Sequence, residues 1–407
     1  MTSTISMSDR LFTPRFLIMC AYSFTVFVSV FQLLPTAPYH VIELGGGTVA
    51  AGLFLGFLTF ASAFSAPFTG AIGDRVGQRH VLITVSVVLA LFTVAYAVIR
   101  DYRVLLGVVI LHGLFWSALL SASGAYMMST LPPARRAEGM GYSGLASVLA
   151  IGAAPAIGFW VYRHGWSVLC WELATLNVLM AIIAWRLPDD LHGAYGHDAH
   201  AAPVVHQSLH RIEWRVLLLS VALAVISFGY GGLTSFSALY ADYLHVSPRS
   251  LFLSMMAVSM LVGRLTLGRW IDRIGHRRVL TKCLPVPALG LLLLSVTNGP
   301  VLFAVSACIF GAGFGLMHPA FTAYMITHVP FARRGAAFGA MLAAFDTGIG
   351  SGSSAMGWVI DRVGFRPGFA MTAALAALAL PAFLVLERRL GFAQRGSGLF
   401  STGNPKT

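Results

Sequence analysis

Two carboxylates, Glu172 and Asp346, have the clearest capacity for chemistry because each lies within a long apolar stretch. A carboxylate at membrane depth is costly, so it marks a group that carries a proton or contacts a solute. Asp346 lies near the middle of its stretch and precedes Gly348, Gly350 and Gly352. The alternative for Asp346 is satisfaction by Ser, Thr or backbone groups where Gly-rich helices pack. Glu172 lies closer to the end of its stretch, and its alternative is a side chain that reaches the membrane interface.

Three basic or imidazole side chains also fall inside apolar stretches, namely His112, His318 and Arg264. A histidine there can shuttle protons or donate a hydrogen bond to a solute, although a packed and satisfied histidine is the commoner finding. Arg264 could bind an anionic solute. The alternative is that it pairs with Asp272, two turns further along the chain, as part of a closed gate.

The elements that hold these residues must be membrane-spanning helices. Of the 407 residues, 57% are hydrophobic and only 10% are charged, which is too little charge to cover a soluble protein of this size. The net charge of +12 is divided among short clusters between apolar stretches, so we do not expect nucleic-acid binding. Runs long enough to cross a bilayer predict an all-α protein with twelve spans. They lie near residues 15–38, 48–72, 80–99, 104–129, 140–162, 167–187, 214–240, 248–270, 279–298, 300–327, 335–359 and 367–387.

The distribution of Lys and Arg predicts the orientation of these spans. With the N-terminus in the cytoplasm, twenty of the 27 basic residues fall on the cytoplasmic side, six fall on the outer side, and Arg264 lies within a span. This excess agrees with the positive-inside rule and predicts that both termini are cytoplasmic. The first residues lack the pattern of a cleaved signal peptide, so we expect the first span to remain.

The chain repeats itself at an offset of 198 residues. The segment 70–79 (GAIGDRVGQR) matches 268–277 (GRWIDRIGHR) at Gly, Asp, Arg, Gly and Arg, and 132–136 matches 330–334 at the same offset. Parallel repeats of this kind are a recurring design of transporters. They predict two six-helix bundles at 1–188 and 213–390, joined by a linker at 189–212 and followed by a cytoplasmic tail at 391–407.

The linker contains five histidines, at positions 192, 197, 200, 206 and 210. Their spacing matches no standard metal site, so we expect a solvated loop, with metal sensing as the alternative. The four cysteines all fall in apolar stretches and are expected to be free thiols. We therefore predict no metal, no cofactor and no disulfide.

The repeated segment G-x-x-x-D-R-x-G-x-R resembles the signature of the major facilitator superfamily, and the resemblance covers the whole chain. It implies a gate that latches the two halves in one conformation and breaks during transport; the alternative is a loop that only fixes topology. The expected gate residues are Gly70, Asp74, Arg75, Gly77 and Arg79 with Gly268, Asp272, Arg273, Gly275 and Arg277.

The fifth span contains Gly141, Ala154, Pro155 and Gly158, which is similar to the family's antiporter motif but has Ala at two of its glycine positions and Phe159 at the last. This favours efflux. The Arg that exporters of the family often carry in the fourth span is absent, because Val109, His112 and Gly113 occupy the aligned region. Proton coupling would therefore have to use other groups.

The resemblance and the residues together predict a transporter that moves a small amphipathic compound outward, driven by protons. Few Asn and Gln lie within spans, which disfavours a sugar site, whereas aromatic residues favour an amphipathic solute. The candidate lining residues are Phe31, Trp116, Tyr126, Phe228, Tyr230, Phe236, Tyr240, Phe314 and Tyr324. The alternatives are uptake of a small metabolite and, less favoured, a membrane sensor. An enzyme is not expected, because the sequence has no phosphate-binding loop or nucleophile elbow. We expect a monomer in the cell inner membrane.

Overall fold

The computed structural model describes residues 11–132, 135–189, 214–329 and 334–390, and these residues form helices without strands. The first six helices are α1 (Pro14–Glu43), α2 (Thr48–Val76), α3 (Gln78–Val98), α4 (Tyr102–Thr130), α5 (Arg136–Tyr162) and α6 (Trp166–Trp185). The others are α7 (Trp214–Leu219), α8 (Val221–Tyr243), α9 (Leu251–Ile274), α10 (His276–Cys283), α11 (Pro285–Ser295), α12 (Pro300–His328), α13 (Arg334–Val363), α14 (Phe365–Ala377) and α15 (Ala379–Arg389).

All twelve predicted spans are present, and three of them consist of two consecutive helices. The pairs α7–α8, α10–α11 and α14–α15 are each separated by one residue: Ser220, Leu284 and Leu378. Pro285 follows the second of these breaks, and a proline removes a hydrogen bond from the helix ladder. The Ser220 hydroxyl donates to the Val216 carbonyl at 2.8 Å, a bond that commonly bends helices. These three interruptions are therefore local and do not change the number of spans.

Helix length and composition agree with a multi-pass membrane protein. Within the described residues, ten helical segments are long and apolar enough to cross a membrane, and 251–266 of α9 is a shorter apolar helix. The remaining span, α13, has 30 residues but is rich in Ala, Gly and Ser. Small side chains let helices approach one another closely. In agreement with this, α13 packs along both α2 and α8.

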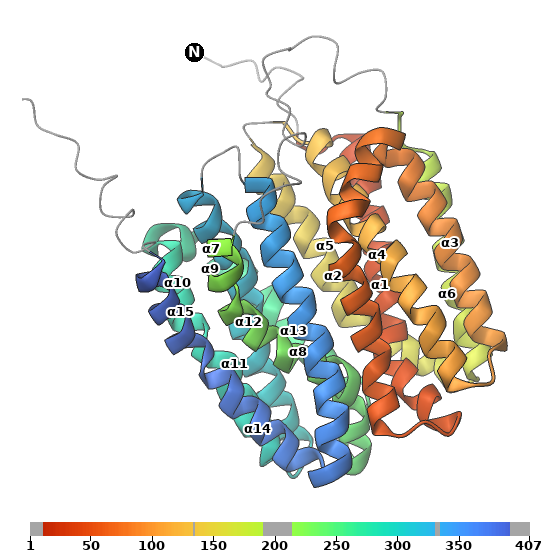
Figure 1. Ribbon diagram of the computed structural model, residues 1–407, viewed down its shortest axis with the longest axis vertical. Coiled ribbons are helices and arrows are strands. Elements are labelled where there is room, and N and C mark those ends of the chain that lie inside the picture. Colours follow the sequence, from red (N-terminus) through yellow and green to blue (C-terminus); the bar gives the residue numbers. More distant parts are fainter. Residues whose placement is uncertain (1–10, 133–134, 190–213, 330–333, 391–407) are drawn as a thin grey trace, which may run out of the picture.

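The helices form two bundles that lie side by side (Figure 1). We call α1–α6 the N-half and α7–α15 the C-half. Within the N-half, α2 packs on α4, α3 on α6 and α1 on α5; within the C-half, α9 packs on α12 and α8 on α13. The halves meet mainly through α2 with α13 and through α5 with α9, with a smaller contact between α1 and α8.

Two glycines give the chain repeat a direct structural counterpart. Gly77 ends α2 with φ of 92°, and Gly275 ends α9 with φ of 90°. Side chains are strained in this conformation, so glycine allows each tight reversal into the next helix. We call the end of the molecule with these two turns the motif end and the opposite end the far end.

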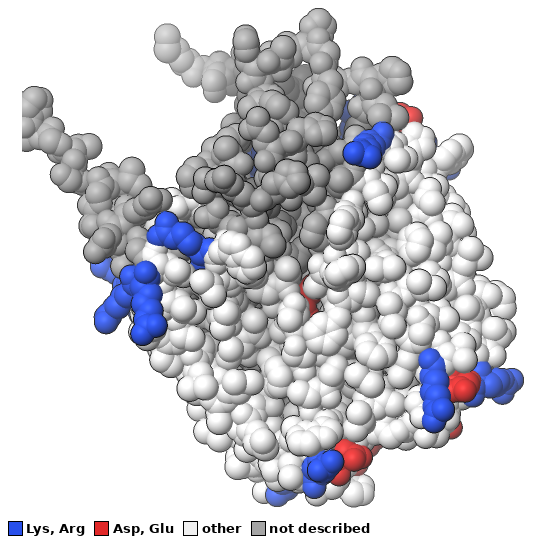
Figure 2. Space-filling model, in the orientation of Figure 1, with Lys and Arg blue, Asp and Glu red and all other residues white. Residues whose placement is uncertain are grey.

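On the face shown in Figure 2, the charged side chains lie near the two ends of the molecule, and the band between them is almost uncharged. Large apolar side chains are exposed in that band, including Leu91, Trp171 and Leu265. An exposed apolar belt between two charged rims is the surface that a lipid bilayer requires.

Candidate functional site

Asp346 lies at mid-depth where the two halves meet. Its carboxylate accepts a hydrogen bond from the Ser62 hydroxyl at 3.1 Å, so α13 of the C-half is joined here to α2 of the N-half. The Asp346 side chain is buried, with 8% of its surface exposed. It lies about 18 Å along the helix axis from the start of α13, which places it near the middle of the span. Of the two carboxylates predicted within spans, Asp346 contacts the other half and Glu172 bonds within its own half.

Several contacts close the far end. The Tyr39 hydroxyl of α1 donates to Asp242 of α8 at 2.9 Å, and the Arg249 Nε donates to the same carboxylate at 2.8 Å. The Arg249 guanidinium also lies over the Tyr39 ring, 4.9 Å from its centre. In addition, Thr48 donates to Asp361 at 3.0 Å. The described contacts of α2 with α13 thus run from the far end to Asp346.

Three further contacts between the halves share one chemical pattern. Side chains of the C-half donate to backbone carbonyl oxygens of N-half glycines: Ser353 to Gly52 at 2.7 Å, Ser254 to Gly152 at 3.0 Å and Arg264 to Gly144 at 3.2 Å. We call these three contacts the carbonyl seam. At Gly52 a glycine is needed for this approach, because a Cβ there would lie 2.4 Å from the Ser353 carbonyl oxygen.

Arg264 is a partly buried cation whose described partners are both neutral. Its Nε donates to the Gly315 carbonyl of α12 at 3.3 Å, in addition to the bond from Nη1 to Gly144. No ion pair joins it to a carboxylate among the residues that the structure describes. The side chain of Asp272, its predicted alternative partner, lies outside the described part of the chain.

His318 is one turn beyond Gly315 on α12 and belongs to a run of aromatic rings. Its ring meets Phe345 edge-on at 5.2 Å, and Phe314 lies between Phe345, at 6.1 Å, and Tyr230, at 4.5 Å. Tyr230 and Phe314 were both predicted to line a site. The run connects α8, α12 and α13, and Phe345 directly precedes Asp346.

Glu172 lies inside the N-half rather than between the halves. It accepts a hydrogen bond from the Gln32 amide of α1 at 3.0 Å, and nearby the Ser29 hydroxyl donates to Asn177 at 3.2 Å. The Gln32 Oε1 and Glu172 Oε2 atoms are buried and have no described hydrogen-bond partner. The Glu172 carboxylate is therefore a second group within a span that could take up a proton.

His112 faces α3, away from the other half. Its Nδ1 is 2.9 Å from the Tyr96 hydroxyl, and its ring stacks on Phe92 at 5.8 Å. At 4% exposed it is enclosed by its own bundle. This environment is that of a packed and satisfied histidine, so His112 has no described contact with the interface between the halves.

The final arginines of the two motif copies bind within their own halves. Arg79 donates to the Trp185 carbonyl of α6 at 2.8 Å and lies 3.6 Å from Asp189. Arg75 is exposed. The side chains of Asp74, Asp272 and Arg273, and the environment of Gly70 and Gly268, lie outside the described part of the chain. The predicted latch between the halves therefore stays a prediction.

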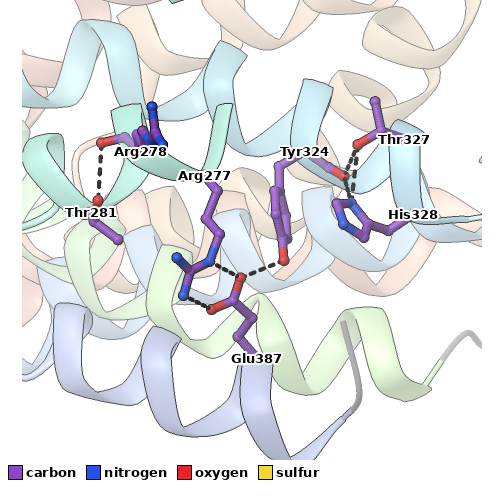
Figure 3. Close-up of polar contacts among 7 residues, drawn as sticks. All are labelled: Arg277, Arg278, Thr281, Tyr324, Thr327, His328 and Glu387. Atoms are coloured by element: carbon purple, nitrogen blue, oxygen red, sulfur yellow. Dashed lines mark hydrogen bonds and ion pairs between the residues drawn. The ribbon is translucent and has the colours of Figure 1, made fainter. Parts of the chain in front are cut away.

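The second copy forms a tight polar cluster that we call the Glu387 cluster (Figure 3). Arg277 of α10 donates to both carboxylate oxygens of Glu387 in α15, at 2.7 and 2.9 Å, and the Tyr324 hydroxyl of α12 donates at 2.7 Å. The Glu387 side chain is 0% exposed. The cluster holds three spans of the C-half together at the motif end.

Sequence reasoning did not single out Glu387, although a signal was present. Glu387 stands 198 residues after Asp189, and the same offset relates Arg277 to Arg79 and Tyr324 to Tyr126. In the N-half the Tyr126 hydroxyl donates to the Pro188 carbonyl at 3.0 Å. Extending the repeat beyond the loops would have identified this cluster.

The small residues of the fifth span allow close packing of α5. A Cβ at Gly158 would lie 2.9 Å from the Gln32 backbone in α1, and Ala154 is fully buried. Pro155 is also buried, whereas Gly141 has open space around it. The motif-like residues thus place α5 between α1 and α9.

Among the described residues, no three His, Cys, Asp or Glu side chains form a group that could hold a metal. The five histidines of the predicted linker lie outside those residues. The cysteines at positions 20, 170, 283 and 308 are free thiols.

Comparison with known proteins gives matches along the whole chain. The family model for the Major Facilitator Superfamily matches residues 16–265 and 219–399. An uncharacterized MFS-type transporter of Pseudomonas aeruginosa is 28% identical over 385 residues, covering 90% of this chain and 92% of the relative. The Escherichia coli MFS-type transporter YhhS is 24% identical over 378 residues, with 90% and 91% covered.

Solved structures share the fold at low sequence identity. A mutant form of the nucleoside transporter NupG has a TM-score of 0.74 at 15% identity, covering 91% of this chain and 99% of NupG. The human organic anion transporter MFSD10 has a TM-score of 0.66 at 14% identity, covering 91% and 98%. The twelve-helix arrangement of this chain is therefore the one found in these transporters.

Proposed function

Because the chain belongs to the major facilitator superfamily, we propose that this membrane transporter exports a small amphipathic compound in exchange for protons. That it is a transporter and not an enzyme follows from the family and from its relatives. The proposed solute class, coupling ion and direction rest on the residues described above. The solved neighbours contribute only the fold, since their names give different solutes.

The observation that carries the proposal is the position of Asp346. It is a buried carboxylate at mid-depth whose described partner, Ser62, belongs to the other half. When Asp346 is charged it is a strong acceptor for that hydroxyl, and when it is protonated the bond weakens. Proton uptake would thereby loosen a contact that must break when the halves rock about the centre, which is the step required for alternating access.

The direction of transport is proposed from the fifth span. Its small residues and Pro155 resemble the antiporter motif, and in the structure they allow α5 to pack closely on α1 and α9. The far-end contacts of Tyr39, Asp242 and Arg249 support a conformation closed at that end. An exporter takes up its solute from the motif end in such a conformation.

We also propose that the protein is a monomer in the cell inner membrane, with the motif end and both termini in the cytoplasm. The excess of Lys and Arg in the segments assigned to that side supports this orientation. The halves would comprise residues 1–188 and 213–390.

The test is proton movement into and out of proteoliposomes that contain the purified full chain, on addition of amphipathic compounds, sugars and organic anions. We expect a compound-dependent proton flux that Asp346→Asn abolishes while solute exchange partly remains. Glu138→Gln is the control, because it removes an exposed carboxylate that pairs with Arg135 at the start of α5 and has no place in the proposed mechanism. Saturable binding of a compound without any proton flux would refute proton coupling. Protons that move in the same direction as the compound would refute exchange and indicate uptake by symport.

A further inference from the structure

We infer that Arg264 and His318 form the recognition site for an anionic group, so that the solute is a small organic anion with an aromatic or apolar body. This inference rests on the proposed transport function and names the class of its solute. Its starting point is a guanidinium at mid-depth that has no described carboxylate partner. An unpaired cation at this depth is costly, and such groups mark solute or ion pathways.

The carboxylates described at this depth are engaged elsewhere. Asp346 bonds Ser62 across the α2–α13 contact, and Glu172 bonds Gln32 inside the N-half. Asp272 is two turns, or about 12 Å of helix rise, closer to the motif end than Arg264. The guanidinium has five N–H groups, and its described bonds use only two of them. Donors therefore remain for an anion that enters the site.

His318 supplies a second polar group beside Arg264. It lies one helical turn from Gly315, whose carbonyl accepts the Arg264 Nε. The described residues offer its ring nitrogens no hydrogen bond, and the side chain is partly exposed within the bundle. An imidazole beside a guanidinium forms a donor pair suited to a carboxylate, sulfonate or phosphate.

The rest of the site is apolar and aromatic. Phe345 lies edge-on to the His318 ring, and Phe314 and Tyr230 continue the run at 6.1 and 4.5 Å. Such walls favour a flat or hydrophobic body next to the charged group. The site thus has a cationic end and an aromatic wall, which matches an aromatic organic anion.

The position of Arg264 also connects occupancy of the site to the carbonyl seam. Its Nη1 bond to Gly144 is one of the described links between α5 and α9. A charged oxygen is a stronger acceptor than a peptide carbonyl, so a bound anion would compete for this donor. Binding would then weaken the link and favour movement of the halves.

Equilibrium binding to the purified full chain tests the inference with three compounds that share one ring system: 2-naphthoate, 2-naphthalenemethanol and 2-naphthylmethylamine. We expect the anion to bind at least about tenfold more tightly than the other two, as one charge-assisted contact implies. Arg264→Gln should remove that preference. Arg362→Gln, which removes an arginine that lies over Trp358 at the far end, is the matched control and should retain it. Equal binding of the three compounds, or an unchanged preference in Arg264→Gln, overturns the inference.

A second measurement requires no solute and no transport. In a background without the four native cysteines, His318→Cys is labelled with a sulfonate and with a trimethylammonium methanethiosulfonate. We expect the ratio of the two rates to favour the sulfonate and to fall several-fold when Arg264→Gln is added. A ratio that does not change refutes a cationic site at this position. If the transport assay shows proton-coupled flux of a neutral compound but not of an anion, the proposed function stands and only the inference of an anionic solute is refuted.

Discussion

Glu387→Gln should destabilise the protein, because Glu387 is a fully buried carboxylate that joins three spans. Its two oxygens accept two hydrogen bonds from Arg277 and one from the Tyr324 hydroxyl, at 2.7–2.9 Å. An amide of the same size keeps one acceptor but puts an N–H₂ group opposite a donor. The substitution therefore removes a charge-assisted bond and leaves a donor unsatisfied.

The expected magnitude follows from the exposure of the two partners. A hydrogen bond to a charged group contributes about 1.5–3 kcal/mol, and an unsatisfied buried partner costs a similar amount. The Arg277 side chain is 49% exposed and can turn toward water, which reduces the cost. We expect a loss of about 1–3 kcal/mol, equivalent to a Tm lower by about 2–5 °C.

The repeat provides a matched control in the other half. Asp189 occupies the equivalent position, but it is 44% exposed and lies 3.6 Å from Arg79. Exposed ion pairs contribute about 0–1 kcal/mol, so Asp189→Asn should lower the Tm by much less. Thermal unfolding of the purified variants, followed by size-exclusion chromatography, compares them directly. Equal shifts for the two variants, or no shift for Glu387→Gln, would refute the assignment of stability to burial of this cluster.

Three more substitutions test other parts of the structure. Gly52→Ala forces α2 away from the Ser353 carbonyl, so hydrogen exchange at the far end should rise. Tyr39→Phe removes the bond to Asp242 and should weaken far-end closure by about 1 kcal/mol, or about fivefold in population, measured by pulsed EPR distances between the halves. His112→Phe should lower the Tm but retain proton flux, because His112 packs within its own bundle.

Each of these substitutions has a control or a contradicting result. Gly107→Ala is the control for the glycine substitution, since a Cβ there meets no atom within 4 Å. An unchanged distance distribution for Tyr39→Phe would show that the far end is held by other contacts. Loss of proton flux in a folded His112→Phe protein would place that histidine in the coupling mechanism after all.

The fold could be predicted from the sequence because its main signals are local. Runs of apolar residues set the spans, and the repeated loop set the relation between the halves. The breaks at Ser220 and Leu378 could not be located, because a single back-bonding hydroxyl or a nearby proline does not interrupt the apolar run. The glycines that follow Asp346 indicated close helix packing, but the sequence did not identify α2 as the partner of α13.

The candidate site was predicted less completely, because it depends on which side of a helix a residue faces. Asp346 and His112 both lie at mid-span, yet one lies between the halves and the other packs on α3. Hydropathy does not separate these cases. Glu387 was missed for a related reason: a carboxylate at the end of a span looks exposed until its partners on two other helices are known.

The carbonyl seam has a consequence for how this protein tolerates genetic change. Its donors are all side chains of the C-half, whereas its acceptors are backbone oxygens of N-half glycines. No missense change can delete a peptide oxygen, so the chemical specificity of the seam is encoded in one half of the gene. In a saturation-mutagenesis library, we expect Ser254 and Ser353 to tolerate only substitutions whose side chains can still donate a hydrogen bond. At Gly52, by contrast, we expect tolerance to depend only on the size of the new side chain.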